Sequence, residues 1–430
     1  MEATESIQTP DKAESDPENV EQSEDINPCQ SVTTDEPYAY LPDYPVNSIL
    51  FGLILSLART SMYIIQDLQT TAFQDNGFLL MGLTTFFSSV SGIFMVYLFN
   101  YLGFNRTLSL VTFFYTLYTI SNYLGYIPFI VGLIPFAGIS NIAFWYISIW
   151  YSKEISDKTD KFNYNNGIIN SMTLSSIIYG NILVGVLLSS GLNISQVFLS
   201  SSIISIIALF CSNFIRSPRY ISFLDQPLLT DNQFGHQSSQ SFYDTLYFTV
   251  SGKLLKVFVF CLTGGAIMGY ATGAMTKYIG INYGGQYIGY ILAFHGIIYI
   301  ISLTVTGKLS DIYGLYPIML VGLSTTFLSC LVMITFTNFW WFNLGVALLA
   351  IGRSILVTQG WTIFRTYYPE KYDSCVSWAL SVGYIGFTSF LLICYLIDDW
   401  IYQSMIMMVY VVIGGINGII VHHDMRRGST

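Results

Sequence analysis

Three side chains that carry or can carry a charge stand within long apolar stretches of this 430-residue sequence: Arg59, His295 and Arg353. A charge inside a lipid bilayer is costly unless it faces a cavity or a partner, so such residues mark candidate functional sites. We predict that Arg59 and Arg353 line or gate a central cavity. The alternative is structural: Arg59 would join helices or reach an interface, and Arg353 would hydrogen-bond a neighbouring carbonyl.

Polar residues around Arg59 recur at the three-, four- and seven-residue spacing of one helical face. Ser56 precedes the arginine, and Tyr63 and Gln66 follow it. We therefore expect Tyr63 and Gln66 to line the same cavity as Arg59.

Two further polar stripes follow the helical repeat. They comprise His295, Tyr299, Ser302 and Thr306 in one segment, and Asn170, Thr173 and Asn181 in another. An unperturbed histidine titrates near neutral pH, so His295 is a candidate for carrying a coupling proton. The alternative is a buried imidazole that hydrogen-bonds a neighbouring helix. Packing between helices explains the second stripe, with Asn170 kept as a cavity candidate.

The composition is that of a protein embedded in lipid. Hydrophobic residues make up 53% of the chain and charged residues 10%, against about 25% charged in soluble domains. The apolar runs are long enough to cross a bilayer as helices, and we predict an all-α membrane protein with about twelve transmembrane helices in two six-helix halves. The predicted spans are 47–67, 77–99, 107–123, 127–151, 167–189, 194–215, 254–276, 287–306, 316–336, 339–362, 376–397 and 400–421.

The acidic residues concentrate before the first span. Residues 1–45 hold 12 of the 26 acids and a single base, Lys12, with too few apolar residues to form a core. No basic region followed by a short apolar run opens the chain, so we expect no cleaved signal peptide. The predicted organisation is a disordered acidic cytosolic tail (1–45), a six-helix bundle (46–215), a cytosolic linker (216–252), a second bundle (253–421) and a cytosolic tail (422–430).

The distribution of lysine and arginine orients the predicted spans. With the amino terminus in the cytosol, 14 of the 17 basic residues lie on the cytosolic side and only Lys277 lies outside. The other two, Arg59 and Arg353, lie within spans. An error in the span count would scramble this division, so we predict that both termini are cytosolic.

Carboxylates are missing from the middle of the predicted spans. Asp67, Asp75, Asp398 and Asp399 fall at the ends expected to face outward, and Asp311 falls in an expected inner loop. Because proton-driven transporters usually place an acid within a span, this pattern disfavours proton coupling through a buried acid.

Signatures of enzymes and metal sites are absent from the sequence. There is no Walker loop, GxSxG elbow, HExxH pair or exposed pair of catalytic carboxylates. The six cysteines are scattered without a CxxC pair, which disfavours a disulfide framework or zinc site. We predict no enzyme activity, catalytic residue, metal site, cofactor or nucleic-acid partner; the lipid bilayer is the expected environment.

The two halves carry a weak internal repeat. VYLFNYLGFNR (Val96 to Arg106) corresponds to TGKLSDIYGLY (Thr306 to Tyr316), which aligns Gly103 with Gly314 at an offset of 211 residues. A six-plus-six duplication is the plan of major facilitator transporters, whose halves rock around a midplane site. GKLSDIYG is similar to the cytoplasmic loop motif of that superfamily. The resemblance implies a gating loop with Gly307, Lys308, Asp311 and Gly314.

The match to this loop motif is partial. Ile312, Leu315 and Tyr316 stand where basic residues are usual, and Asn100 stands at the first-half aspartate position. We therefore expect the tight turn to survive without the usual charged gate.

The chain more specifically resembles the Unc-93-like (uncoordinated-93-like) branch of the superfamily. The residues that carry this resemblance are QDLQTTAF (66–73), GLTTFFSSVSGIF (82–94), YLGFNRTL after it, GYATGAMTKYIG (269–280), and Trp145 and Tyr151 at the family's spacing. The sequence departs from the family at Ser148 and Ile149, where a glutamine-glycine pair is usual. This family includes solute transporters, members without a known substrate, an ion-channel accessory subunit and a receptor-trafficking chaperone.

Two functional hypotheses therefore stay open. The first is a carrier that moves a small polar or organic solute by alternating access. The second is a transport-inactive accessory protein or chaperone that binds another membrane protein. DQPLL (225–229) and YAYL (38–41) look like sorting signals, so the expected location is the plasma membrane or an endomembrane such as the vacuole.

Overall fold

The computed structural model describes residues 44–73, 75–159, 162–215, 252–336, 338–368 and 371–428. The chain from Pro45 onward forms one compact unit, and every long regular element in the described ranges is a helix. The predicted acidic tail, apart from its last two residues, and the predicted linker, apart from Gly252, lie outside the described residues.

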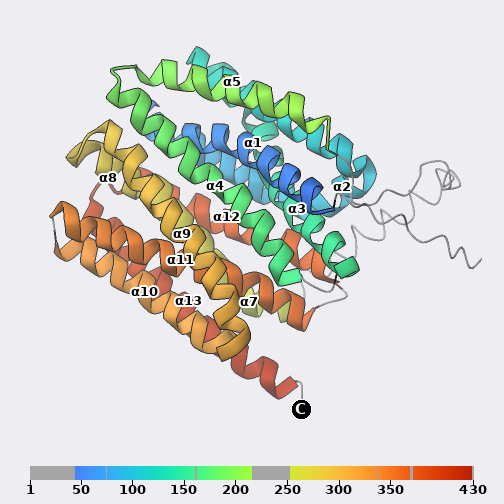
Figure 1. Cartoon of the computed structure of the whole chain (residues 1–430). Coiled ribbons are helices and arrows are strands. Elements are labelled where there is room, and N and C mark those ends of the chain that lie inside the picture. The colour runs from blue at the N-terminus through green and yellow to red at the C-terminus, as the bar shows by residue number, and fades with distance from the viewer. Residues whose placement is uncertain are drawn as a thin grey trace, which may run out of the picture. The chain divides into compact units, whose positions relative to one another are not determined.

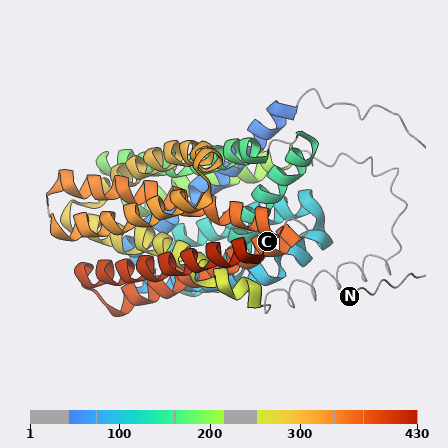
Figure 2. The ribbon, with the colours of Figure 1, turned by 90° about the horizontal axis from the view of Figure 1, so that it is seen from below.

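The described helices fall into two groups that follow the two halves of the sequence (Figure 1). The first group is α1 (Tyr44–Phe73), α2 (Asp75–Leu124), α3 (Ile127–Thr159), α4 (Phe162–Ser189) and α5 (Ile194–Ser212). The second is α7 (Gly252–Gly269), the π-helical turn η1 (Tyr270–Ala274), α8 (Met275–Asn282), α9 (Gly285–Tyr313), α10 (Leu315–Thr335), α11 (Phe339–Tyr367), α12 (Tyr372–Leu396) and α13 (Trp400–Gly428). Figure 2 shows that the helices of both groups run along one common direction.

Twelve membrane crossings result from this arrangement. Eleven described helices are long and apolar enough to span a bilayer, and one of them covers the 49 residues Asn76–Leu124. A continuous helix of that length would extend about 74 Å, more than twice the hydrocarbon thickness of about 30 Å. Gly103 interrupts it with φ 74° and ψ 171°, which divides α2 into two crossings. The predicted fold class is thereby confirmed.

Several helices continue beyond the apolar segments that predicted them. α3 reaches Thr159, α11 reaches Tyr367 and α13 reaches Gly428. The expected boundaries followed the hydrocarbon thickness, whereas a helix can extend into the polar region beyond it. Residues 422–428, expected to form a cytosolic tail, are therefore part of α13.

The seventh crossing is built from α7, η1 and α8 rather than from one regular helix. All five residues of the π turn are buried, and Tyr270 shares a hydrogen bond of 2.9 Å with Ser404 of α13. Upstream of the turn, a β-carbon on Gly265 would collide with the backbone of Gly383 in α12. The local irregularity therefore lies where this crossing packs closely on its neighbours.

On α5, buried hydroxyl groups and exposed apolar side chains lie on different faces of the helix. Ser201 and Ser205 are buried, whereas Ile203 and Phe210 are exposed. The Ser205 hydroxyl pairs with Thr116 of α2 at 3.0 Å. This pattern is the one expected where lipid surrounds the molecule and hydroxyl groups join helices within it.

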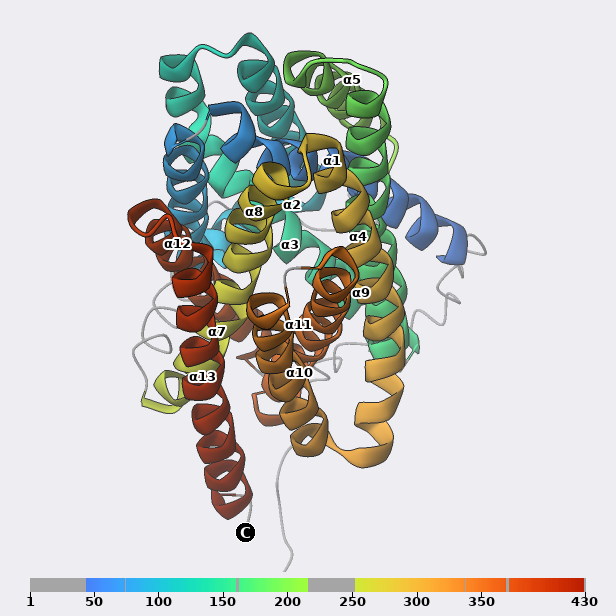
Figure 3. The same cartoon turned by 90° about the vertical axis from the view of Figure 1, so that its left-hand side faces the viewer.

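The two halves meet along two pairs of helices, α4 with α9 and α2 with α12. At the first contact a β-carbon on Gly289 would collide with the backbone at Asn181 and Gly185. At the second, Thr388 donates a hydrogen bond of 2.8 Å to Thr85. Figure 3 shows α4 and α9 side by side.

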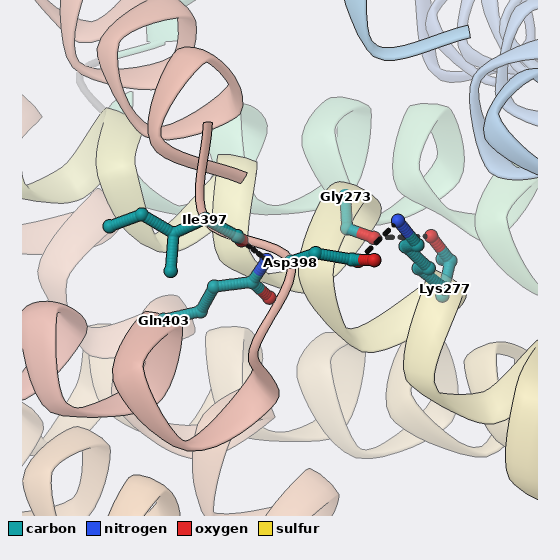
Figure 4. A network of polar contacts seen from close by, with 6 residues as sticks. Gly273, Lys277, Ile397, Asp398 and Gln403 are labelled. Atoms are coloured by element: carbon teal, nitrogen blue, oxygen red, sulfur yellow. Dashed lines mark hydrogen bonds and ion pairs between the residues drawn. The ribbon is translucent and has the colours of Figure 1, made fainter. Parts of the chain in front are cut away.

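Ion pairs lie near both ends of α12. At its start, Lys153 of α3 pairs with Asp373 at 2.9 Å and so connects the two halves. After its end, Lys277 of α8 pairs with Asp398 at 2.6 Å, as Figure 4 shows. The ammonium group of Lys277 also lies 5.2 Å from the ring centroid of Phe78 in α2.

Candidate functional site

Arg59 lies in the interior of the first half, with 1% of its surface exposed. Its Nη1 donates hydrogen bonds to the Tyr115 hydroxyl at 3.0 Å and to Asn141 Oδ1. The Tyr115 hydroxyl donates to the same Asn141 oxygen at 3.1 Å. Because Tyr115 belongs to α2 and Asn141 to α3, these hydrogen bonds connect Arg59 of α1 to two other helices of the first half.

Aromatic rings surround the same guanidinium. Its carbon lies 4.7 Å from the ring centroid of Trp145, 5.1 Å from Tyr63 and 5.4 Å from Phe144. Such cation–π contacts compensate a buried charge in part. Tyr384 of α12, in the second half, also interacts with Arg59. We call the residues around the guanidinium the Arg59 cage: Tyr63, Tyr115, Asn141, Phe144, Trp145 and Tyr384.

Arg353 forms the second polar group, on α11 in the other half. It is 4% exposed, and its guanidinium carbon lies 5.0 Å from the ring centroid of Tyr299 on α9. The imidazole of His295 lies nearly parallel to the Tyr299 ring, with centroids 6.1 Å apart. Arg353 Nε and His295 Nε2 have no hydrogen-bond partner in the described part of the chain.

Tyr63 and Tyr299 connect the two arginine groups. Both belong to one buried cluster with Leu174 and Ile177 of α4 and Ala350 of α11. Of the residues predicted to line a cavity, this cluster brings together Tyr63 of the first half and Tyr299 of the second.

The position of Asp67 differs from the one predicted for the end of the first span. It is 2% exposed, and the apolar helix continues to Phe73, so the predicted end of the first span came six residues too early. The carboxyl group interacts with the Asn181 side chain and with the charge of Arg353. The first span was predicted to end at its first acidic residue. Asp67 follows Tyr63 by four residues, however, so it continues the same helical face.

Two further predicted cavity residues lie on the first half. Gln66 is buried on α1, like Arg59 and Tyr63. Asn170 accepts a hydrogen bond of 3.5 Å from Ser148 of α3, which favours the packing interpretation of its stripe.

The predicted gating loop is not a loop. Gly307, Lys308 and Asp311 lie within α9, and Gly314 alone leaves the helical conformation. The side chain of Asp311 is outside the described residues. A single glycine suffices because its positive φ reverses the chain between α9 and α10.

Sequence reasoning missed Tyr115, Asn141 and Tyr384, which surround Arg59. Asn141 carried a usable signal, since it is an amide side chain within an apolar span. The two tyrosines carried none, because 32 tyrosines are spread through the chain. No group of three or more His, Cys, Asp or Glu side chains suited to a metal ion occurs among the described residues.

These features define a multi-pass α-helical membrane protein whose two halves meet around buried polar residues. The profile of the Major Facilitator Superfamily matches residues 254–427. This match covers the second half of the chain, and the arrangement of the helices is of the major facilitator type.

Two solved transporter structures have a similar fold over most of this chain. The nucleoside transporter NupG, in a mutant form, has a TM-score of 0.65 at 11% identity, covering 88% of this chain and 99% of its own. A POT family transporter in complex with 5-aminolevulinic acid has a TM-score of 0.62 at 11% identity, covering 86% and 95%. At this identity the likeness concerns the fold alone. A search of curated proteins finds no match.

Proposed function

We propose that this protein is a carrier of a small solute that works by alternating access, with its solute site at the contact between the Arg59 cage and Arg353. The observation that supports the proposal most is the concentration of buried polar groups from both halves at one place. In the first half, Arg59 lies against Tyr63, and Asp67 is buried one helical turn further along α1. In the second half, Arg353 and His295 both lie beside Tyr299, and the two tyrosines belong to one buried cluster.

The energetics favour a ligand site over a purely structural contact. Buried polar atoms in folded proteins are nearly always hydrogen-bonded. Here Arg59 Nε, Tyr63 hydroxyl, Asn181 Oδ1, His295 Nε2 and Arg353 Nε have no partner within the described protein. Each such atom costs about 1 to 3 kcal/mol, a cost that a polar solute offsets when it supplies hydrogen bonds.

A specific observation also favours the alternative, an accessory or chaperone of the Unc-93-like type. Arg59 is bonded within one half to Tyr115 and Asn141, as a purely structural residue would be. The Nε atoms of both arginines lack a partner among the described residues, but Arg353 has no counterpart of the bonds that Arg59 Nη1 makes to Tyr115 and Asn141. This difference is the reason for preferring a carrier.

Locking the halves together tests the carrier. Thr85 and Thr388 are hydrogen-bonded at 2.8 Å across the halves, so a cysteine pair at these positions should form a disulfide there. Purified protein in liposomes would be given a metabolite extract, and the solutes taken up would be identified by mass spectrometry. We expect the oxidised pair to stop uptake and a reductant to restore it.

The matched control is a cysteine pair at Thr112 and Ser212, whose hydroxyls are 3.2 Å apart within the first half. This disulfide should leave uptake intact, because the first half can still move as a unit. Both pairs belong in a background with the native cysteines replaced by serine. Folded protein that takes up no solute in any redox state would contradict the carrier and favour the accessory protein.

A further inference from the structure

The geometry around Asp67 and Arg353 points to the class of solute: we propose that the site binds a small zwitterion, with an ammonium group at Asp67 and a carboxylate at Arg353. This inference rests on the proposed solute site and specifies its chemistry. It starts from two opposite charges on opposite halves of the molecule.

Asp67 and Arg353 are both almost completely buried, at 2% and 4% exposure. Each lies one helical turn from a member of the same buried cluster, Asp67 from Tyr63 and Arg353 from Ala350, and no ion pair joins the two among the described side chains. A buried ion needs a close partner to offset the loss of hydration. Two complementary charges beside one buried cluster, without an ion pair between them, can each accept a charge of the opposite sign.

The unpaired atoms beside each charge match this assignment. Asn181 donates through Nδ2 to the Ile177 carbonyl at 2.8 Å, which leaves Oδ1 as an unpaired acceptor next to Asp67. An ammonium group has three N–H donors and no acceptor, so Asp67 and Asn181 are suitable partners. At the other end Arg353 Nε–H is an unpaired donor, as a carboxylate requires.

An apolar wall lies beside the two polar ends. Tyr299 lies under the Arg353 guanidinium and belongs to the cluster with Tyr63, Leu174 and Ile177. These side chains can pack on the hydrocarbon part of a solute. Amino acids and ω-amino acids have this combination of two opposite charges and a carbon skeleton.

A zwitterion would also connect the moving parts. Asp67 belongs to α1 in the first half, and Arg353 belongs to α11 in the second. A solute that bonds both draws the halves together around itself, whereas a solute with one charge bonds only one half. Asp67 and Arg353 would therefore favour zwitterions, because only a zwitterion can bond both halves when they close around it.

Matched probes test the assignment directly. The full chain in detergent would be heated with phenylalanine, with phenethylamine, which lacks the carboxylate, and with 3-phenylpropionate, which lacks the amine. A shorter set comprises γ-aminobutyrate, butylamine and butyrate. We expect at least one of the two zwitterions to raise the melting temperature, and its singly charged counterparts to bind about tenfold more weakly or worse, because each loses a charged hydrogen bond.

Single substitutions test which residue binds the ammonium group and which binds the carboxylate. Asp67→Asn should abolish the preference for the zwitterion over the acid, and Arg353→Gln should abolish its preference over the amine. The controls Asp398→Asn and Lys308→Gln change exposed charges and should leave both preferences unchanged. The melting temperature without probe shows whether each variant is folded, and the isosteric Asp67→Asn change keeps the test interpretable if Arg353→Gln does not fold.

The outcomes separate this inference from the carrier. Zwitterion binding that depends on Asp67 and Arg353 but leads to no uptake in liposomes would support the site and contradict the carrier. Uptake of a solute whose binding is insensitive to both variants would support the carrier and overturn the zwitterion. Equal binding of a zwitterion and its acid, or no binding of either zwitterion, would also overturn it.

Discussion

Gly103 and Gly314 adopt the same unusual backbone conformation, 211 residues apart. Gly103 has φ 74° and ψ 171°, and Gly314 has φ 83° and ψ 167°. Each stands between the second and third crossings of its half. The weak sequence repeat that aligned these two glycines therefore marks a structural repeat, and the shared element is a one-residue turn.

Replacing either glycine by alanine should destabilise the protein. A positive φ with ψ near 180° is open essentially to glycine alone, and a strained residue there costs about 1 to 3 kcal/mol. We expect Gly103→Ala and Gly314→Ala to lower the melting temperature in detergent.

Gly307→Ala is the matched control for this prediction. Gly307 lies within α9, and a β-carbon there would meet no atom within 4 Å. This change should leave stability unchanged or slightly raised, because alanine favours a helix. Equal behaviour of all three variants would show that the turns tolerate side chains.

The fold could be read from the sequence because lipid imposes a strong and simple pattern. Apolar length indicated each crossing, and the repeat located Gly103, without which α2 would be counted as one span. Helix ends were less accurate, because nothing in an apolar run shows how far a helix continues beyond the hydrocarbon. The extension of α1 past Asp67 is the costliest example, since it hid a buried acid.

The candidate site could be predicted only in part. Rare residues within spans, such as Arg59, His295 and Arg353, stand out without any structure. Their partners do not, because Tyr115 and Tyr384 resemble many other tyrosines until the fold brings them to Arg59. Helical spacing gives the face of one helix, but it does not give the neighbour that packs on that face.

The even number of crossings predicts that the two termini lie on one side of the membrane. Epitope tags before residue 46 and after Gly428 should show the same protease accessibility in sealed vesicles, and the basic residues place both in the cytosol. A tag between Asn282 and Gly285, at the turn between α8 and α9, should show the opposite accessibility. Termini on different sides would require eleven or thirteen crossings.

The ion pair between Lys153 and Asp373 should bias the equilibrium between conformations more than it affects folding. Its side chains are 30% and 37% exposed, and such an exposed pair contributes at most about 1 kcal/mol. Because it joins the two halves, Lys153→Gln should favour opening at this end by up to about fivefold.

Native Cys375 reports on that opening, since it lies two residues after Asp373 and is fully buried. Its alkylation by a membrane-impermeant reagent, followed by mass spectrometry, should become faster in Lys153→Gln. The charge exchange Lys153→Asp with Asp373→Lys should restore slow alkylation. An unchanged rate in all variants would show that the pair does not hold this end closed.

Arg59→Gln is expected to destabilise the protein rather than to act on solute binding alone. The guanidinium is 1% exposed, bonds Tyr115 and Asn141, and lies against Trp145 and Tyr63. Losing it removes the donor to the Tyr115 hydroxyl and one of the two donors to Asn141 Oδ1. This loss costs about 1 to 3 kcal/mol and should lower the melting temperature in detergent. Arg59→Lys should recover only part of the lost stability, because an ammonium group lacks the planar guanidinium that forms hydrogen bonds and stacks on aromatic rings at the same time.

The control variant Lys308→Gln removes an exposed charge and should leave stability unchanged. If Arg59→Gln instead keeps wild-type stability while uptake falls sharply, Arg59 contacts the solute directly and the structural role assigned to it here is wrong.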